Sequence, residues 1–227
     1  AKTLEVSLQS IENQTFSNLE VIVMDGASTD RTVVIAQEYV SSIPRMQIYS
    51  EKDNGIYDAM NKAIAKASGE WLFFMGSDDG FYSETVLEQI ANEITISEID
   101  AIYGDVYSDR FNGRYAGEFT VDKLIKQNIC HQALFMHRRL FDKIGIFNLK
   151  YKSHADWDHN IRWFFRSSIR KKYVDIVVAN YADGGYSSMN FDKAFHKVRP
   201  YKCLYLGFNK LSRKSIKKLI KQILGYT

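Results

Sequence analysis

Short apolar segments that alternate with helix-period segments constrain the fold of this chain most strongly. β-Branched and aromatic residues dominate the runs at 20–24, 46–50 and 70–75, whereas the segments between them place apolar residues three or four positions apart. Strands that alternate with helices are typical of a mostly parallel sheet covered by helices on both faces, so we expect an α/β fold. Further strands are expected at 101–103, 133–137 and 173–179, and helices around 4–11, 33–35, 56–67, 83–94 and 157–165.

Charge is distributed unevenly along the 227 residues. Ten Lys and Arg and no Asp or Glu lie between 193 and 227, whereas the rest of the chain holds 20 basic and 27 acidic residues. We therefore expect one packed domain at 1–190 and a basic helical extension at 191–227. The apolar runs are much shorter than the roughly 20 residues of a membrane-spanning helix. Because only two cysteines are present, we expect a reducing, cytoplasmic compartment.

Two polar clusters follow predicted strands, at 25–30 and at 76–79. Ligands of open α/β sheets bind beyond the carboxyl ends of the strands. The adjacent carboxylates of Asp78 and Asp79 repel each other, and a divalent cation that also binds a diphosphate would relieve this repulsion. These two residues fit equally well as caps of the following helix.

Three segments that include these clusters resemble glycosyltransferase family 2. They are residues 10–32, with Asp25-Gly-Ala-Ser, residues 51–63, with Asp53-Asn-Gly-Ile-Tyr-Asp58, and residues 67–79, which end in Gly76-Ser-Asp-Asp79. The resemblance extends from about residue 4 to 190. It implies a GT-A fold, Mn²⁺ or Mg²⁺ as cofactor, and inverting transfer of a sugar from a nucleotide-diphosphate donor, commonly a UDP-sugar, to a glycan or lipid-diphosphate-linked acceptor.

The same resemblance assigns the donor site. Asp25 matches the residue that contacts the nucleobase, and Asp78 and Asp79 match the metal signature, although Gly76 stands where the family often has its first Asp. The family segment near the base and phosphates is matched by Asp53, Asp58, Asn61 and Lys62. Lys62 fits equally well as an exposed cation on a helix.

A proton acceptor is expected at 154–162. Inverting transfer needs a base that takes the proton of the acceptor hydroxyl. The family carries this base as the Asp of an acidic pair, which here reads Ala155-Asp156, so we expect Asp156 to be the base in preference to Asp158. Asp156 also fits as a helix cap. Trp157 is expected either to stack on a sugar or to pack in the core.

Two further segments resemble parts of the family cleft. His131-Gln132 matches a segment between donor and acceptor, and we favour a site role for it over a purely structural one. The loop Asp183-Gly-Gly-Tyr-Ser187 is expected either to cover the donor phosphates or to be a plain turn.

One departure from the family concerns the start of the chain. The sequence begins inside the helix that follows the first family strand, so we expect that strand to be missing. This departure, with Gly76 and Ala155, keeps a second hypothesis open, namely a catalytically weak homologue that binds nucleotide sugar or acts as a scaffold. A nucleotidyltransferase is a third hypothesis, but the sequence shows no glycine-rich triphosphate loop.

The basic tail predicts an amphipathic helix after Ser212. Apolar residues recur from Ile216 to Leu224 at helical spacing, and lysines lie on the other side. Such a helix suits an anionic membrane on the inner face of the cell, or docking on its own domain with the lysines in water. Nucleic acid is not expected as a partner, because no binding motif accompanies the charge.

Overall fold

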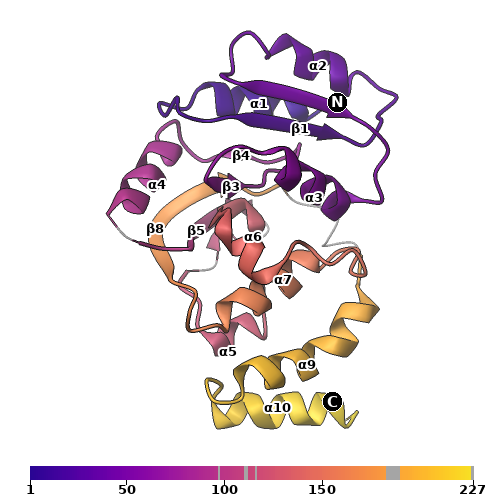
Figure 1. Ribbon diagram of the computed structural model, residues 1–227, viewed down its shortest axis with the longest axis vertical. Coiled ribbons are helices and arrows are strands. Elements are labelled where there is room, and N and C mark those ends of the chain that lie inside the picture. Colours follow the sequence, from indigo (N-terminus) through magenta and orange to yellow (C-terminus); the bar gives the residue numbers. More distant parts are fainter. Residues whose placement is uncertain (97, 110–111, 116, 183–189, 226–227) are drawn as a thin grey trace.

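The computed structural model describes residues 1–96, 98–109, 112–115, 117–182 and 190–225. Figure 1 shows a small sheet with its helices at the N-terminal end, a larger sheet with helices in the middle, and two helices at the C-terminal end. In these residues no helix is both long enough and apolar enough to cross a bilayer. The loop at 183–187 lies outside the described residues.

The N-terminal layer consists of α1 (Leu4–Glu12), β1 (Val21–Asp25), α2 (Thr32–Glu38) and β2 (Met46–Ser50). The two strands are parallel, and Leu8 of α1 and Ala36 of α2 are buried in one apolar cluster beside them. Asp25 is in register with Ser50, so both strands end at the same edge. The two apolar runs thus form the predicted strands, and β1 ends at the first polar cluster.

The larger sheet has the order β3 (Trp71–Phe73), β7 (Leu134–His137), β5 (Ala101–Ser108), β8 (Lys171–Asn180) and β4 (Gly80–Phe81), with β6 (Gly113–Tyr115) also paired to β5. A mixed sheet is confirmed, but the expectation that it is mostly parallel is wrong. Over the described residues, β5 and β8 are parallel, whereas the other four pairs of this sheet are antiparallel. Apolarity marks a strand as buried but does not encode its direction, and the short connection from β5 to β6 allows only an antiparallel pair.

Helices cover both faces of the larger sheet, as predicted. Alternate residues of β5 point to opposite faces. Ala101 and Tyr103 pack in a cluster with α7, whereas Ile102 packs in a second cluster with α4. The helices of this layer are α3 (Ile56–Lys66), α4 (Val86–Thr95), α5 (Val121–Leu124), the 3₁₀ turn η2 (His131–Ala133), α6 (Arg139–Ile144) and α7 (Ala155–Phe164).

The C-terminal layer consists of α9 (Lys193–Gly207) and α10 (Arg213–Ile223). The side chains of Asp192 and Ser212 cap the two helices, as the sequence predicts for Ser212. Gly207 lets α9 approach the domain closely, because a Cβ at this position would lie 2.1 Å from the Phe165 ring. Leu219 of α10 is buried in the same cluster as α7. The apolar stripe of α10 therefore docks on its own domain in part, through Ile216 and Leu219, whereas Ile220 and Leu224 stay exposed. Membrane contact, the other alternative for this stripe, stays a prediction.

Candidate active site

Asp25 is held at the end of β1 by two serines. Its Oδ2 accepts hydrogen bonds from Ser50 Oγ at 2.6 Å and from the Ser28 amide at 3.0 Å. Burial alone would raise the pKa of Asp25, but these hydrogen bonds lower it below its ordinary value. The turn after β1 therefore carries a charged, oriented carboxylate.

Asp53 lies against the turn that follows Asp25. A Cβ at Gly26 would lie 2.6 Å from Asp53 Oδ2, so a side chain there would displace this carboxylate. Asp53 Oδ1 in turn accepts a hydrogen bond from the Gly55 amide at 2.8 Å. The structure thus brings together two of the residues predicted for the donor site.

Asp58 and Lys62 close the loop before α3. Asp58 Oδ2 accepts a hydrogen bond from the Asn54 amide at 2.9 Å, and this bond is the main reason why the pKa of Asp58 is lowered. Lys62 Nζ lies 3.7 Å from the Asp58 carboxylate and donates to the Lys52 carbonyl at 2.8 Å. Lys62 therefore stabilises this loop and is not an isolated exposed cation.

The two carboxylates at 78 and 79 have different environments. Buried Asp79 accepts hydrogen bonds from the amides of Gly76 and Ala182 and from Gln132 Nε2. Asp78 is exposed. A Cβ at Gly76 would lie 2.8 Å from Asp78 Oδ1 and 2.7 Å from Asp79 Oδ2. A side chain at 76 would therefore displace one or both of these carboxylates.

The dipeptide His131–Gln132 on η2 connects two of the predicted carboxylates. Gln132 Nε2 donates to Asp79 Oδ2 at 2.9 Å, and His131 Nδ1 lies 3.6 Å from Asp156 Oδ2. Successive residues of a 3₁₀ turn point about 120° apart, which lets neighbours reach different partners. Three segments distant in sequence, around 79, 131 and 156, thus meet at one place.

Asp156 lies in the first turn of α7 within a set of hydrogen-bond donors. Oδ1 accepts from the Tyr57 hydroxyl and from the Trp157 amide, each at 2.8 Å, and Oδ2 accepts from Asn128 Nδ2 at 2.7 Å. Burial would raise the pKa of Asp156, but His131 and these hydrogen bonds hold it below its ordinary value. Its side chain is 12% exposed. Asp156 is thus an ionised, oriented carboxylate that still reaches the surface.

Sequence reasoning missed Tyr57 and Asn128 as partners of Asp156. Both lie inside the segments that resemble the family, but an aromatic residue in an amphipathic helix is typical of the core. Tyr57 is indeed buried, and its pKa is raised by burial and by the Asp156 charge. A second hydrogen bond fixes the orientation of the Asn128 amide, because its Oδ1 accepts from Asn160 Nδ2 at 2.8 Å.

Comparison with known proteins matches residues 1–173 to the model of glycosyl transferase family 2. The chain belongs to this family. A relative from Mycobacterium tuberculosis, a PGL/p-HBAD biosynthesis glycosyltransferase, is 42% identical over 204 residues, which cover 88% of this chain and 80% of the relative. The chain is therefore a glycosyltransferase that uses a nucleotide-sugar donor.

Solved structures confirm the GT-A fold. Residues 1–349 of S. aureus TarS, in complex with UDP-GlcNAc, superpose with a TM-score of 0.74 at 19% identity, over 98% of this chain and 68% of that chain. The mannosyltransferase PcManGT from Pyrobaculum calidifontis, in complex with GDP-Man and Mn²⁺, has a TM-score of 0.66 at 18% identity, over 99% of this chain and 76% of that chain. At these identities the likeness concerns the fold.

Asp158 has a structural role in this transferase. Its buried carboxylate pairs with Arg162 of the same helix at 3.0 Å and with Lys202 of α9. The acid two residues after Asp156 therefore joins α7 to the C-terminal layer.

Trp157 and Asn61 are also engaged in structure, in contrast to their predicted roles. Buried Trp157 donates its indole N–H to the Leu124 carbonyl at 2.8 Å, and Arg199 lies 4.6 Å from its ring centroid. Asn61 exchanges two hydrogen bonds of 3.0 Å with the backbone of Phe147. Of the two alternatives for Trp157, its burial and its hydrogen bond support packing in the core, and the Asn61 amide is committed to the chain itself.

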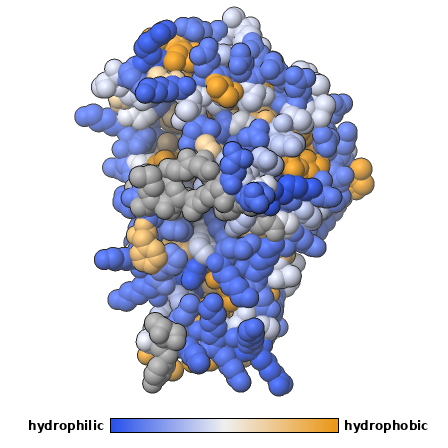
Figure 2. All heavy atoms as spheres, turned by 180° about the vertical axis from the view of Figure 1, so that it is seen from behind, coloured by the Kyte–Doolittle hydropathy of each residue, from blue (hydrophilic) through white to orange (hydrophobic). Residues whose placement is uncertain are grey.

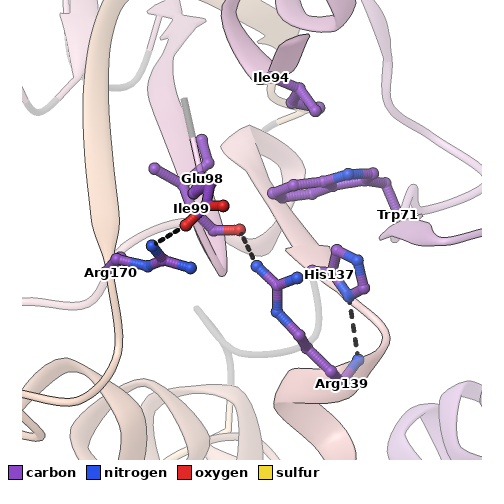
Figure 3. Close-up of a pocket in the computed structure, with 7 residues that line it drawn as sticks. All are labelled: Trp71, Ile94, Glu98, Ile99, His137, Arg139 and Arg170. Atoms are coloured by element: carbon purple, nitrogen blue, oxygen red, sulfur yellow. Dashed lines mark hydrogen bonds and ion pairs between the residues drawn. The ribbon is translucent and has the colours of Figure 1, made fainter. Parts of the chain in front are cut away.

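A cavity of about 220 Å³ lies apart from these carboxylates, at the beginning of β3 (Figure 3). Trp71 and His137 form one wall, and their rings meet edge-on at 5.4 Å. The two arginines that line it are bound to the chain, Arg139 to the Ile99 carbonyl and Arg170 to Glu98. The cavity contains none of the predicted site residues.

Proposed function

We propose that this glycosyltransferase moves a sugar from a UDP-sugar to a hydroxyl group of a glycan or a lipid-linked acceptor, with inversion at the anomeric carbon. The observation that carries the proposal is the link through His131–Gln132. This link supports the proposal, because adjacent residues contact Asp79 of the acidic turn and Asp156, the carboxylate that we assign as the base. A base beside a diphosphate-binding turn is the arrangement that inverting transfer needs.

Asp156 acts as the general base in this proposal. It takes the proton from the acceptor hydroxyl while that oxygen forms a bond to the anomeric carbon, and the bond from this carbon to the diphosphate oxygen breaks on the opposite face. The nucleoside diphosphate leaves with the electron pair. Asp156 is ionised at neutral pH, as a proton acceptor must be, and its lowered pKa extends the ionised state to more acidic pH. Tyr57 and Asn128 orient it through the bonds already described.

The donor base is proposed to bind beside Asp25 and Asp53. Uracil offers an N–H donor, which a carboxylate accepts, and the two serines hold Asp25 in its charged form. Asp58 and Lys62 contribute indirectly, because they shape the loop that carries Asp53.

A divalent cation fits Asp78 better than Asp79. Both Asp79 oxygens already accept hydrogen bonds, whereas Asp78 is exposed. Among the described residues no group of three or more His, Cys, Asp or Glu forms a complete metal site. Mg²⁺ is often held by one or two carboxylates together with substrate phosphates and water, and one exposed carboxylate suits that mode. When bound, the cation would neutralise charge on the leaving diphosphate.

Release of UDP from UDP-sugars tests the proposal. The protein is incubated with several UDP- and GDP-sugars, with and without Mn²⁺, and released nucleotide is measured. We expect UDP release that depends on the metal and is lost in Asp156→Asn, and NMR of the transferred or hydrolysed sugar should show an inverted anomeric centre. Binding of UDP without release or transfer would instead favour the weak, nucleotide-sugar-binding homologue. Retention of configuration would contradict the proposed mechanism.

We also propose that the enzyme works in the cytoplasm at the inner face of the membrane, where a lipid-linked acceptor would present its sugar. Two cysteines in 227 residues support a reducing compartment.

A further inference from the structure

Helix α9 carries a stripe of apolar side chains that face water. Val198, Tyr201, Tyr205 and Phe208 follow one another at intervals of three or four residues, which places them on one side of the helix. They are 41%, 55%, 88% and 59% exposed, respectively. The opposite side of α9 is the one that packs on the domain. This exposed stripe, which we call the α9 stripe, is therefore not needed to attach the helix.

Both C-terminal helices carry many exposed basic side chains. Between 193 and 225 the exposed charged residues are Lys193, Lys197, Lys210, Arg213, Lys214, Lys217, Lys218 and Lys221. The same span contains no Asp or Glu. The acids that reach it from the domain are already bonded, Asp122 to Ser212 and Asp158 to Lys202. The end of the molecule formed by α9 and α10 is therefore strongly positive.

The two C-terminal helices form the end of the molecule opposite to the N-terminal sheet (Figure 1). Hydrophilic side chains project from this end, with hydrophobic atoms between them (Figure 2). Ile220 of α10 and Leu224 at its C-terminal end also remain exposed. Apolar and aromatic groups thus occur among lysines over one convex end.

We propose that the α9 stripe, together with the exposed lysines of α9 and α10, is a docking face for an anionic lipid bilayer. Tyrosine rings are favourable at the headgroup level, because one end of the ring is apolar and the other is polar. Each Lys or Arg near an anionic bilayer contributes about 1 kcal/mol, which corresponds to roughly fivefold in affinity. The face differs from the one that the sequence indicated, which was the apolar stripe of α10 and is partly buried against the domain.

Charge and shape favour the bilayer over other occupants. A second copy of the chain would bring two positive ends together, which is unfavourable. Single-stranded nucleic acid binds in grooves that follow its backbone, whereas the α9 stripe lies on a convex helix face. Docking is independent of the proposed transfer reaction, so either can fail alone.

Vesicle sedimentation of the full chain tests this proposal. The protein is mixed with phosphatidylcholine vesicles and with vesicles in which roughly a third of the lipid is phosphatidylglycerol. We expect binding to the anionic vesicles only, weakened by high salt. Tyr205→Ser with Phe208→Ser should weaken it at least about tenfold, because two aromatic side chains lose their contact with lipid. Lys217→Gln with Lys218→Gln should weaken it by roughly fivefold per lysine.

Matched variants elsewhere on the surface serve as controls. Val6→Ser with Ile96→Ser removes two exposed apolar side chains, and Lys2→Gln with Arg31→Gln removes two exposed charges in the N-terminal layer, at the other end of the molecule. Both should sediment like the wild type. All exchanged side chains are exposed, and circular dichroism and thermal unfolding should show unchanged folding.

Several outcomes would overturn the proposal. The proposal fails if the wild-type protein stays in the supernatant, or if it binds equally to both kinds of vesicle. It also fails if the Tyr205→Ser, Phe208→Ser variant binds the anionic vesicles as the wild type does. A change of mass in sedimentation equilibrium caused by the same two substitutions would assign the α9 stripe to a second copy instead. Binding of single-stranded RNA, without vesicle binding, would assign it to nucleic acid.

Discussion

Asp156→Asn changes one oxygen of the proposed base into an amide nitrogen. The Asn oxygen can still accept from the Tyr57 hydroxyl and the Trp157 amide, but the new NH₂ group faces Asn128 Nδ2 at the position of a 2.7 Å hydrogen bond. Asn128 cannot turn its oxygen round without loss, because this oxygen accepts from Asn160. One buried hydrogen bond is therefore replaced by two facing donors, which lowers the free energy of unfolding by about 1–3 kcal/mol.

The effect on rate should be larger than the effect on stability. Loss of a general base typically slows a reaction by about 10²- to 10⁴-fold, or about 2.7–5.5 kcal/mol of activation free energy. The loss should appear in kcat, while the Kd of the donor stays nearly unchanged, because the base acts in the transition state. Hydrolysis of the UDP-sugar measures kcat without knowledge of the acceptor, and titration calorimetry with UDP measures the Kd.

A second substitution separates the two effects. In Asn128→Asp with Asp156→Asn the carboxylate moves across the hydrogen bond, and the new Asp accepts both from the Asn at 156 and from Asn160. Donors and acceptors match again, so urea unfolding should give a stability within about 1 kcal/mol of the wild type. Activity should stay lost, because the carboxylate is displaced by the length of a hydrogen bond. Restored activity in this double variant, or an Asp156→Asn enzyme with more than about a tenth of the wild-type kcat, would refute the assignment.

Four more predictions concern neighbouring residues. Gly76→Ala should lose most metal-dependent UDP binding, measured by calorimetry, because its Cβ would collide with both carboxylates. Asp78→Asn should weaken metal-dependent UDP binding and leave the melting temperature unchanged. Asp79→Asn should instead lower the free energy of unfolding, measured in urea, by about 1–3 kcal/mol, because the donors around Asp79 lose an acceptor. Asp158→Ala should lower that free energy by about 3 kcal/mol, because Arg162 and Lys202 lose their partner, with donor Kd unchanged. Folding lowers the pKa of Asp156, so ionised Asp156 stabilises the folded protein at pH values above the ordinary pKa. This stabilisation disappears as the pH falls through the lowered pKa. Between pH 7 and 5, a pH–rate profile should therefore show no loss of kcat caused by protonation of Asp156.

The sequence predicted most elements because their apolar patterns are local. The strand at 46–50 is found with the same bounds, and the predicted helix at 56–67 differs from α3 by one residue. It could not predict strand direction, since β7 and β8 reach β5 from opposite ends while both read simply as apolar runs. Direction depends on the connections between strands, and in the second half of the chain these carry no distinct pattern.

Site residues were predictable where their partners are close in sequence, and less so where the partners are remote. Local polarity pointed to the turn after β1 and to the pair at 78–79, which follow β1 and β3, and their roles stay predictions. Asn61 looked like a ligand residue, yet it bonds the backbone of Phe147, 86 positions away. Tyr57 looked like core and lies beside Asp156, 99 positions away. A side chain whose partner lies far away in the sequence produces no recognisable residue spacing that could predict the contact.

The dipeptide on η2 connects these remote contacts to the proposed catalysis. One peptide unit fixes Gln132 on Asp79 and His131 beside Asp156, so the acidic turn and the proposed base cannot move independently. Misplacement of reacting groups by about 1 Å can lower a rate by about 10²-fold. Because the side chains of consecutive residues in a 3₁₀ turn point in different directions, the two residues His131 and Gln132 are enough to contact both Asp156 and Asp79. The separation between the proposed base and the acidic turn thus depends on the local backbone geometry of η2.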